Sequence, residues 1–368
     1  MAWRILHIYK DYAPVVGGIE NHVKLLAESQ AAQGHEVTVL VTSPTRHTTV
    51  EQLHGVRVIK AARLATVAST PLSLALPWEL RQLRPDIAHI HFPYPVGEVA
   101  QLFCGRARHT VLTYHSDVVR QARILRFYRP LQRRVLQAAE RILVATPNYL
   151  ESSPTLQPFR EKCRIVPYGI DRRPFLTALP EAGQALRARY GGGPLLLFVG
   201  VLRYYKGLQY LLQAMPQVPG RLLLVGEGPM GAALRAQAQD LGLAERVVFV
   251  GRVTDEDLPA YYRAADLFIL PASERSEAFG LVLVEAMTSG LPVISTELGT
   301  GTSYVNQDGA SGLVVPPKDP AALARAINRL LDDASLRARL AQGALARSAL
   351  FSAERMVAAI EAIYAELL

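Results

Sequence analysis

Two glutamates on either side of a glycine-containing turn are the residues of this sequence best suited to bind a polyhydroxyl ligand. Glu277 and Glu285 lie eight positions apart, after an apolar run at Leu267–Leu270 that predicts a strand. The apolar residues after Gly280 predict a helix, which puts Glu277 in the preceding loop and Glu285 about one turn inside the helix. Carboxylates accept paired hydrogen bonds from vicinal hydroxyls, which a sugar and a ribose both offer. The alternative is a capping Glu277 and an exposed Glu285.

A basic pair follows a second predicted strand, at Leu195–Val199. Arg203 and Lys206 lie in the glycine-flanked segment 200–207, just before a predicted helix. Arginine offers a bidentate donor and lysine a compact positive charge, and together they suit a diphosphate that is first bound and then released as a leaving group. Solvated surface charge is the alternative, but the glycines and the position at a strand end favour a ligand.

Two loops in the first half of the chain also follow predicted strands. Gly17 and Gly18 precede a predicted helix, where paired glycines let the backbone approach a ligand and the helix N–H groups attract an anion. An ordinary tight turn is the alternative. His115 follows the predicted strand Val111–Tyr114 and can donate a hydrogen bond to a phosphate or a hydroxyl. A lone histidine is more often structural, so His115 is the weaker of these two signals.

The remaining histidines and cysteines predict no metal centre. His89 and His91 lie on one face of the predicted strand Ile87–His91, and with no third ligand apparent we interpret them as structural residues rather than zinc ligands. Cys104 and Cys163 are interpreted as free thiols, because no other ligand cluster lies near them in the sequence.

The turn Gly226–Gly231 matches the G-x-G-x-x-G pattern of dinucleotide-binding enzymes. The acidic residue expected after the next strand is missing, because the run Val247–Val250 is followed by Gly251 and Arg252. We therefore interpret Gly226 as part of a close turn that lines a nucleotide pocket. A nicotinamide-dependent oxidoreductase stays an alternative, and a non-catalytic module that binds nucleotide sugars or a lipid surface is another.

Arginines crowd one segment of a basic chain. The sequence has 40 Lys and Arg against 32 Asp and Glu, a formal charge of +8, which favours an anionic partner. Segment 120–141 alternates arginines with apolar residues, a pattern typical of a basic amphipathic helix at a membrane surface. A solvated helix face whose arginine stems cover the core is the alternative. The membrane-facing candidates are Arg120, Arg123, Arg126 and Arg133.

The elements that must position these residues alternate between strand-like runs and helical patterns, which predicts an α/β fold with parallel sheets. A chain of 368 residues, half of them hydrophobic, is long enough for two domains. We expect Rossmann-like domains at 1–170 and 195–350, a linker at 171–194, and a C-terminal helix at 351–368 that crosses back to the first domain. Ligands bind at the carboxyl ends of parallel strands, so we expect the site in a cleft between the domains.

The expected location follows from hydropathy. No apolar run approaches the ~20 residues that span a bilayer, and the first residues lack the cationic and long apolar regions of a secretory signal. We therefore expect a cytoplasmic protein, which the arginine-rich segment can bring to the inner face of the plasma membrane.

Taken together, these segments resemble the retaining family-four glycosyltransferases of the GT-B fold. The resemblance covers nearly the whole chain and includes the Gly17–Gly18 loop, the VPYGID segment Val166–Asp171, the VGEGP turn, the pair of Arg203 and Lys206, and the E-x7-E element. It implies an acceptor-binding N-terminal domain, a nucleotide-sugar-binding C-terminal domain, and transfer with retained anomeric configuration. It also implies that neither a metal ion nor another cofactor is needed.

The resemblance further implies a role for each site residue. Arg203 and Lys206 bind the donor diphosphate, Glu285 binds the ribose, and Glu277 holds hydroxyls of the transferred sugar with help from N–H groups of residues 279–281. The implied donor-binding residues are Gly17, Gly18, Arg203, Lys206, Gly226, Arg252, Val253, Glu277, Phe279, Gly280, Leu281 and Glu285. The implied catalytic residues are His115, Arg203, Lys206 and Glu277.

The same resemblance suggests how the first half contributes. Gly17 and Gly18 approach the phosphate or the acceptor, and His115 contacts the sugar near its reacting carbon. The base lies between the turn at 226–229 and the loop at 251–253. No carboxylate is an assured nucleophile on the reacting face, so front-face departure of the diphosphate is favoured, and a covalent double displacement stays open.

Three segments indicate a particular subgroup of this family. The segments YHSDVVRQ at 114–121, LRYYKGL at 202–208 and GTSYVNQDG at 301–309 are similar to bacterial mannosyl- and rhamnosyltransferases of polysaccharide and lipopolysaccharide O-antigen assembly. This similarity implies a GDP-linked mannose or rhamnose donor and a glycan or lipid-diphosphate-linked acceptor. We expect no nucleic-acid partner, and the oligomeric state stays open.

Overall fold

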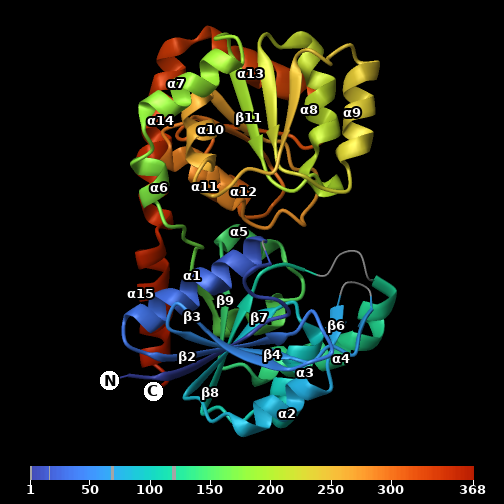
Figure 1. Ribbon diagram of the computed structural model, residues 1–368, viewed down its shortest axis with the longest axis vertical. Helices are drawn as coiled ribbons and strands as arrows, with labels where there is room; N and C mark the ends of the chain where they lie inside the picture. Colours follow the sequence, from blue (N-terminus) through green and yellow to red (C-terminus); the bar gives the residue numbers. More distant parts are fainter. Residues whose placement is uncertain (1, 16, 68–69, 118–121) are drawn as a thin grey trace. The chain divides into compact units, whose positions relative to one another are not determined.

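The computed structural model describes residues 2–15, 17–67, 70–117 and 122–368, with side chains omitted for 122–127. The chain forms two compact units. The first consists of Met1–Gly169 together with Ala353–Leu368, and the second of Ile170–Ser352. Figure 1 shows that each unit contains a sheet with helices packed around it. Every described helix is too short or too polar to cross a bilayer.

The first unit is built on a sheet with the strand order β10-β9-β8-β7-β1-β2-β4-β3. All neighbours in this sheet are parallel except β3 and β4. The strands are β1 Arg4–Ile8, β2 Glu36–Thr42, β3 Thr49–Leu53, β4 Val56–Ala61, β7 Ile87–Phe92, β8 His109–Tyr114, β9 Arg141–Val144 and β10 Cys163–Ile165; β5 Ala65–Val67 and β6 Thr70–Leu72 form a separate hairpin. All residues of β7 are buried, as expected for a central parallel strand covered on both faces.

The helices of the first unit include one from the far end of the chain. They are α1 Gly18–Ala32, α2 Ala75–Gln82, α3 Pro95–Cys104, α4 Ala122–Ala138, α5 Pro147–Ser152, the short 3-10 helix η1 Gln157–Lys162 and α15 Ala353–Ala365. Helix α15 packs against α1, and its Tyr364 is fully buried. The C-terminal segment therefore completes the core of the first unit.

The second unit contains an all-parallel sheet with the strand order β13-β12-β11-β14-β15-β16. The strands are β11 Leu195–Val199, β12 Arg221–Val225, β13 Val247–Gly251, β14 Leu267–Leu270, β15 Val293–Thr296 and β16 Gly312–Val315. The helices are α6 Arg173–Leu176, α7 Pro180–Arg189, α8 Leu208–Ala214, α9 Gly231–Asp240, α10 Leu258–Ala264, α11 Leu281–Thr288, α12 Thr302–Val305, α13 Pro320–Asp332 and α14 Ala334–Ser348, with 3-10 turns η2 Tyr204–Lys206, η3 Met215–Gln217 and η4 Ala349–Phe351.

The predicted fold class is confirmed, because both sheets are mainly parallel and alternate with helices. The antiparallel strand β3 was not predicted. Its residues are exposed or only half-buried, so it lacks the apolar run that marks the other strands.

The predicted linker at 171–194 is wrong as a description of that segment. It contains α6 and α7 and belongs to the second unit. Helix α7 packs against α10, where a Cβ at Gly183 would lie 2.7 Å from the Cβ of Arg263. Arg187 also pairs with Asp266 at 2.9 Å. Pro180 begins α7, and Gly191 and Gly192 lie in the turn after it, so these residues bound a helix rather than form a flexible connection.

A buried glutamate in the first unit makes its stability depend on pH. Glu98, near the start of α3, is fully buried and accepts hydrogen bonds from the Tyr94 N–H at 2.5 Å and from the Tyr128 hydroxyl. Burial raises the pKa of Glu98 from its ordinary 4.5 to about 7. A carboxyl whose pKa is higher in the folded state than in the unfolded state stabilises the fold most at a pH below its ordinary pKa. This stabilisation is lost as the pH rises through the folded-state pKa.

We therefore expect Glu98→Gln to flatten the pH dependence of stability. Between pH 4.5 and 8 the wild type should lose roughly 3 kcal/mol of unfolding free energy relative to the variant, because only the wild type must bury a charge. Urea unfolding of both proteins at several pH values in this range measures the difference. Parallel pH profiles for the two proteins would contradict this account of Glu98.

Candidate active site

The strand order of the second unit brings two functional loops together. The order reverses between β11 and β14, which lie side by side and run in the same direction. The segment after β11 begins with Gly200, and the segment after β14 begins with Pro271. Both start from the carboxyl edge of the sheet, at the position where open α/β sheets bind ligands.

Lys206 and Glu277 meet at this edge as a buried ion pair. The Lys206 Nζ lies 2.5 Å from the Glu277 Oε2, and the two side chains are only 10% and 9% exposed. Burial alone lowers the pKa of Lys206, but the Glu277 carboxylate, Tyr205 and Glu285 outweigh it, so the pKa of Lys206 is raised. Lys206 is therefore a firmly protonated cation held in a site of low polarity.

The turn that carries Lys206 is fixed by a glycine. Gly207 follows η2 in the left-handed conformation, with φ of 69°, and a Cβ there would lie 1.9 Å from the Pro271 carbonyl oxygen. The Ser273 N–H also donates to the Tyr205 carbonyl at 2.8 Å. The loop after β11 thus docks directly onto the loop after β14, and only glycine fits at the point of closest approach.

Glu285 belongs to the same site. It lies on α11, where its Oε2 accepts a hydrogen bond of 2.7 Å from the Tyr262 hydroxyl. Burial raises the pKa of Glu285, while Tyr262 and the nearby Lys206 lower it. Glu277 and Glu285 thus both interact with Lys206, and Glu285 is half-buried rather than exposed.

The backbone between the two glutamates forms the start of α11. Gly280 precedes the helix in the left-handed conformation, and Leu281 is its first residue. Phe279 is buried, with its ring 5.8 Å from that of Phe351. The first N–H groups of a helix have no acceptor within it, so this terminus offers donors beside Glu277.

The glycine turn after β12 lines the same edge. The Gly226 N–H donates to the Gly251 carbonyl at 2.7 Å, and a Cβ at Gly226 would lie 2.2 Å from the carbonyl oxygen of Gly200. The turn therefore packs against the segment that carries Lys206. Arg252 and Val253, just beyond, line a cavity of about 620 Å³ between α7, β13 and α10.

Arg203 is placed differently from Lys206. It lies in the same turn but is exposed, and its guanidinium forms no ion pair with any residue in the described part of the chain. An exposed guanidinium remains available to an anionic ligand, whereas the Lys206 ammonium is already engaged.

In the first unit, Gly17 and Gly18 lie in the segment after β1, next to the point where its sheet order reverses between β1 and β7. A Cβ at Gly17 would lie 2.2 Å from the Glu20 Oε2, the end of a flexible side chain that would have to turn away. A Cβ at Gly18 would meet nothing within 4 Å. Gly17 therefore allows Glu20 to fold back over the helix start, 3.6 Å from the Lys10 Nζ.

His115 is not a free side chain at the edge of the sheet. Its ring is buried, with Nδ1 2.6 Å from the Tyr168 hydroxyl and Nε2 3.1 Å from the His91 Nδ1. Burial lowers the pKa of His115 well below its ordinary range, and His22 adds to this shift. His115 is therefore a neutral imidazole with both nitrogens engaged inside the unit.

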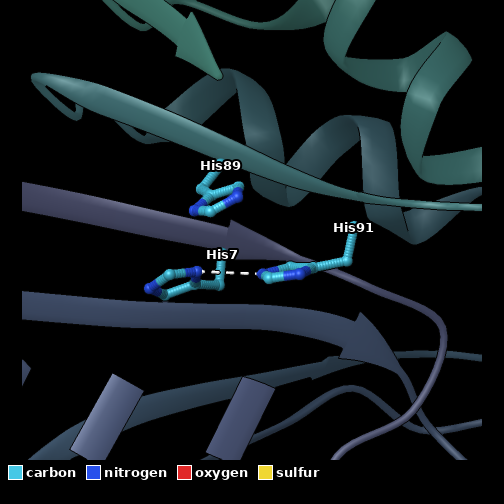
Figure 2. Close-up of side chains that lie close together, drawn as sticks. All are labelled: His7, His89 and His91. Carbon is cyan, nitrogen blue, oxygen red and sulfur yellow. Dashed lines mark hydrogen bonds between the residues drawn. The ribbon is translucent and has the colours of Figure 1, made fainter. Parts of the chain in front are cut away.

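His89 and His91, interpreted from the sequence as structural residues, are both buried and hydrogen-bonded. They belong to a buried cluster with histidines from three other segments, and Figure 2 shows one of these, His7, beside them. The core histidines are His7, His22, His89, His91 and His115. His7 on β1 pairs in register with His89 on β7, so alternation on two strands adjacent in the sheet was the signal that could have revealed the cluster.

The arginine-rich segment forms α4 from Ala122 onward. Arg120 lies outside the described residues, as do the side chains of Arg123 and Arg126, and Arg133 is exposed. On the described part of α4, Val135 and Leu136 are buried, which confirms an amphipathic helix there. The neighbouring arginines that are also exposed are Arg129 and Arg134.

Two family models match the chain. The model described as "Glycosyltransferase Family 4" matches residues 16–173, and the model described as "Glycosyl transferases group 1" matches residues 185–347. Together they cover both loops of the ion pair and the Gly17–Gly18 loop.

Curated relatives and solved structures agree with these matches. D-rhamnosyltransferase WbpZ of Pseudomonas aeruginosa is 41% identical over 94% of this chain and 91% of its own length. O-antigen chain mannosyltransferase C of Escherichia coli is 37% identical over 99% of both chains. A sucrose-phosphate synthase structure from Thermosynechococcus elongatus superimposes with a TM-score of 0.80 and 26% identity, covering 99% of this chain and 98% of that one.

The buried ion pair makes a prediction about stability. Lys206→Met leaves the Glu277 carboxylate buried without its cation, so we expect a loss of about 3–5 kcal/mol in unfolding free energy. Adding Glu277→Gln should recover part of that loss, because no uncompensated charge remains. Urea unfolding of the two variants and the wild type provides the comparison.

The exposed pair Lys318–Glu274 supplies the control. Its atoms are 2.7 Å apart, but both side chains are exposed, so Lys318→Met should leave the unfolding midpoint unchanged. Equal effects of Lys206→Met and Lys318→Met would show that the first pair is not buried in solution.

Proposed function

This chain belongs to the family 4, group 1 glycosyltransferases, and from that premise we propose that it is a retaining transferase for mannose or rhamnose. The proposed donor is a GDP-linked sugar, and the proposed acceptor is a hydroxyl of a glycan or of a lipid-diphosphate-linked sugar. The names of the two relatives, a D-rhamnosyltransferase and an O-antigen chain mannosyltransferase, support this choice of sugar and a role in O-antigen assembly. Family membership removes the reason to consider an oxidoreductase.

The observation on which the proposal rests is the ion pair of Lys206 and Glu277 at the edge where the sheet order reverses. A nucleotide-diphosphate sugar carries anionic oxygens next to a ring of hydroxyls. Lys206 can exchange the carboxylate for a diphosphate oxygen, and Glu277 can exchange the ammonium for sugar hydroxyls. The lysine and the glutamate then each keep a polar partner when the donor binds, so neither charge is left buried alone.

The surrounding residues extend this arrangement to the rest of the donor. Arg203, exposed in the same turn, adds a second cation for the diphosphate. Glu285, oriented by Tyr262, accepts from the ribose hydroxyls. Gly226, Arg252 and Val253 border the base, and the N–H groups at residues 279–281 face the sugar or phosphate.

For the chemical step we propose front-face displacement. The bond from the anomeric carbon to the diphosphate oxygen breaks, the acceptor oxygen bonds to the same face, and the acceptor proton passes to the departing phosphate oxygen. Lys206 and Arg203 stabilise the charge that develops on the diphosphate, so no metal ion is needed for that purpose. No carboxylate is an assured nucleophile on the reacting face, which favours this route over a covalent intermediate.

The first unit is proposed to bind the acceptor through the Gly17–Gly18 loop and the segment at His115. For the His115 ring to contact the sugar directly, its bond to His91 or to Tyr168 must open. The arginine-rich segment 120–141 is proposed to bind the anionic surface that carries a lipid-linked acceptor. The proposed contacts are Arg120, Arg123, Arg126 and Arg133, with ~1 kcal/mol for each basic residue near the lipid.

The activity test measures sugar transfer from GDP-mannose, GDP-rhamnose and their UDP and ADP counterparts, after a thermal-shift screen has ranked the nucleotides. With the preferred donor, Lys206→Ala and Glu277→Ala should each lower kcat by at least ~100-fold, as expected for removal of a charge that stabilises the leaving group or holds the sugar. Circular dichroism verifies the fold of each variant, and Lys318→Ala should retain full activity. Unchanged turnover in both site variants would eliminate this assignment.

The membrane test measures co-sedimentation with liposomes that contain anionic lipid. Replacing Arg123, Arg126 and Arg133 with Glu should abolish sedimentation at low salt, because it reverses the charge of the proposed binding face. The matched control reverses three exposed arginines of the second unit, Arg235, Arg325 and Arg329. If both triple variants sediment like the wild type, α4 is not the docking face.

A further inference from the structure

One core histidine of the first unit has no partner for either ring nitrogen among the residues that the structure describes. This is His22 on α1, which is 4% exposed. A buried polar group left unsatisfied costs about 1–3 kcal/mol. The His22 ring centre lies 5.1 Å from that of His115, 5.7 Å from that of His91 and 4.8 Å from that of Tyr168. The unpartnered ring is thus surrounded by other aromatic groups that carry nitrogen or oxygen.

Three nitrogens in this cluster are close enough to share one ion. His22, His91 and His115 each offer a ring nitrogen, and these atoms lie within 4.8 Å of one another. Imidazole nitrogens bind zinc at about 2.0–2.1 Å, which in a tetrahedral site sets them roughly 3.4 Å apart. The His91 Nδ1 and His115 Nε2 are already 3.1 Å apart, so modest ring rotations suffice.

The outer nitrogens of two of these rings are already held. The Gln30 Oε1 can only accept, so His7 carries its proton on Nε2, which donates to that oxygen at 2.8 Å. The His7 Nδ1 then accepts from the His91 Nε2 at 3.1 Å, which leaves a lone pair on the His91 Nδ1. The His115 Nδ1 lies 2.6 Å from the Tyr168 hydroxyl, and in the ion-bound state this nitrogen carries the ring proton and donates it to Tyr168, which frees the Nε2 lone pair. Ligating histidines are typically fixed in this way through their second nitrogen.

A second trio in the cluster is excluded by its own hydrogen bonds. His7 is engaged by Gln30 and His91 (Figure 2). His89 is engaged at 2.5 Å by the Tyr364 hydroxyl and at 2.6 Å by the Thr113 hydroxyl. The ring that separates the two trios is therefore His89 or His22. Both His89 nitrogens are held by hydroxyls, whereas both His22 nitrogens are unpartnered among the described residues, so the trio with His22 is the one that can accept an ion.

We propose that His22, His91 and His115 bind one transition-metal ion in the core of the first unit. The ligand set consists of neutral imidazoles without carboxylate or thiolate, which suits Zn²⁺, Co²⁺ or Ni²⁺ and does not suit Mg²⁺ or Mn²⁺. The ion links α1, β7 and the segment after β8, so its role is structural. It shares no residue with the proposed diphosphate site and does not rest on the proposed transferase activity. With the ion on the His115 Nε2, the proposed sugar contact of that ring is left to its Nδ1, after the bond to Tyr168 opens.

The test is the metal content of the full-length protein produced with zinc in the medium and dialysed against a weak chelator. We expect about one equivalent of zinc in the wild type. Cobalt supplied in place of zinc should give the strong visible absorption of tetrahedral Co²⁺. His22→Ala should hold at least about tenfold less metal, as expected when a ligand is lost. His54→Ala, which removes an exposed histidine, should match the wild type.

The wild-type measurement is decisive even if the variant folds poorly. A wild type without stoichiometric zinc, and without cobalt absorption, would overturn the proposal. His22→Leu, which fills the space with an apolar side chain, provides the second variant. Equal metal content in His22→Leu and wild type would overturn it as well, because the ion would then reside elsewhere.

Discussion

The second unit depends on keeping two opposite charges together where water is largely excluded. A lysine or a glutamate buried alone would lose its charge or destabilise the fold, whereas the pair at 2.5 Å keeps both. The ion pair requires the turn after β11 to contact the loop after β14, and Gly207 allows the close approach of these two segments. The contact is possible because β11 and β14 are neighbours at the point where the strand order of the sheet reverses.

The first unit handles its buried polar groups in the opposite way. Its core holds histidines whose pKa values burial lowers, to about 4 for His7 and about 3 for His22, so they are neutral. Hydrogen bonds from Gln30 through His7 and His91 to His115 satisfy most of their nitrogens. One unit thus contains a buried charge pair, and the other contains neutral rings of which one, His22, has no partner among the described residues.

Much of this organisation was predictable because it follows from local pattern. Apolar runs marked the parallel strands, and the spacing of Glu277 and Glu285 placed them in a loop and on a helix, as observed. What the sequence could not predict depends on contacts between distant segments. The composition of the α7 segment suggested a linker, since the packing of α7 on α10 is a tertiary contact that composition does not reveal. His115 was predicted to be free to bind a ligand, because its hydrogen-bond partners His91 and Tyr168 are remote in sequence.

The central claim is that a sugar nucleotide takes over both halves of the Lys206–Glu277 pair. The most direct measurement is a crystal structure of the protein with the non-hydrolysable analogue of its preferred donor. The account predicts that the Lys206 Nζ moves to hydrogen-bond distance of a diphosphate oxygen and that the Glu277 carboxylate accepts from hydroxyls of the sugar. An analogue bound elsewhere, with the ion pair still closed, would contradict it.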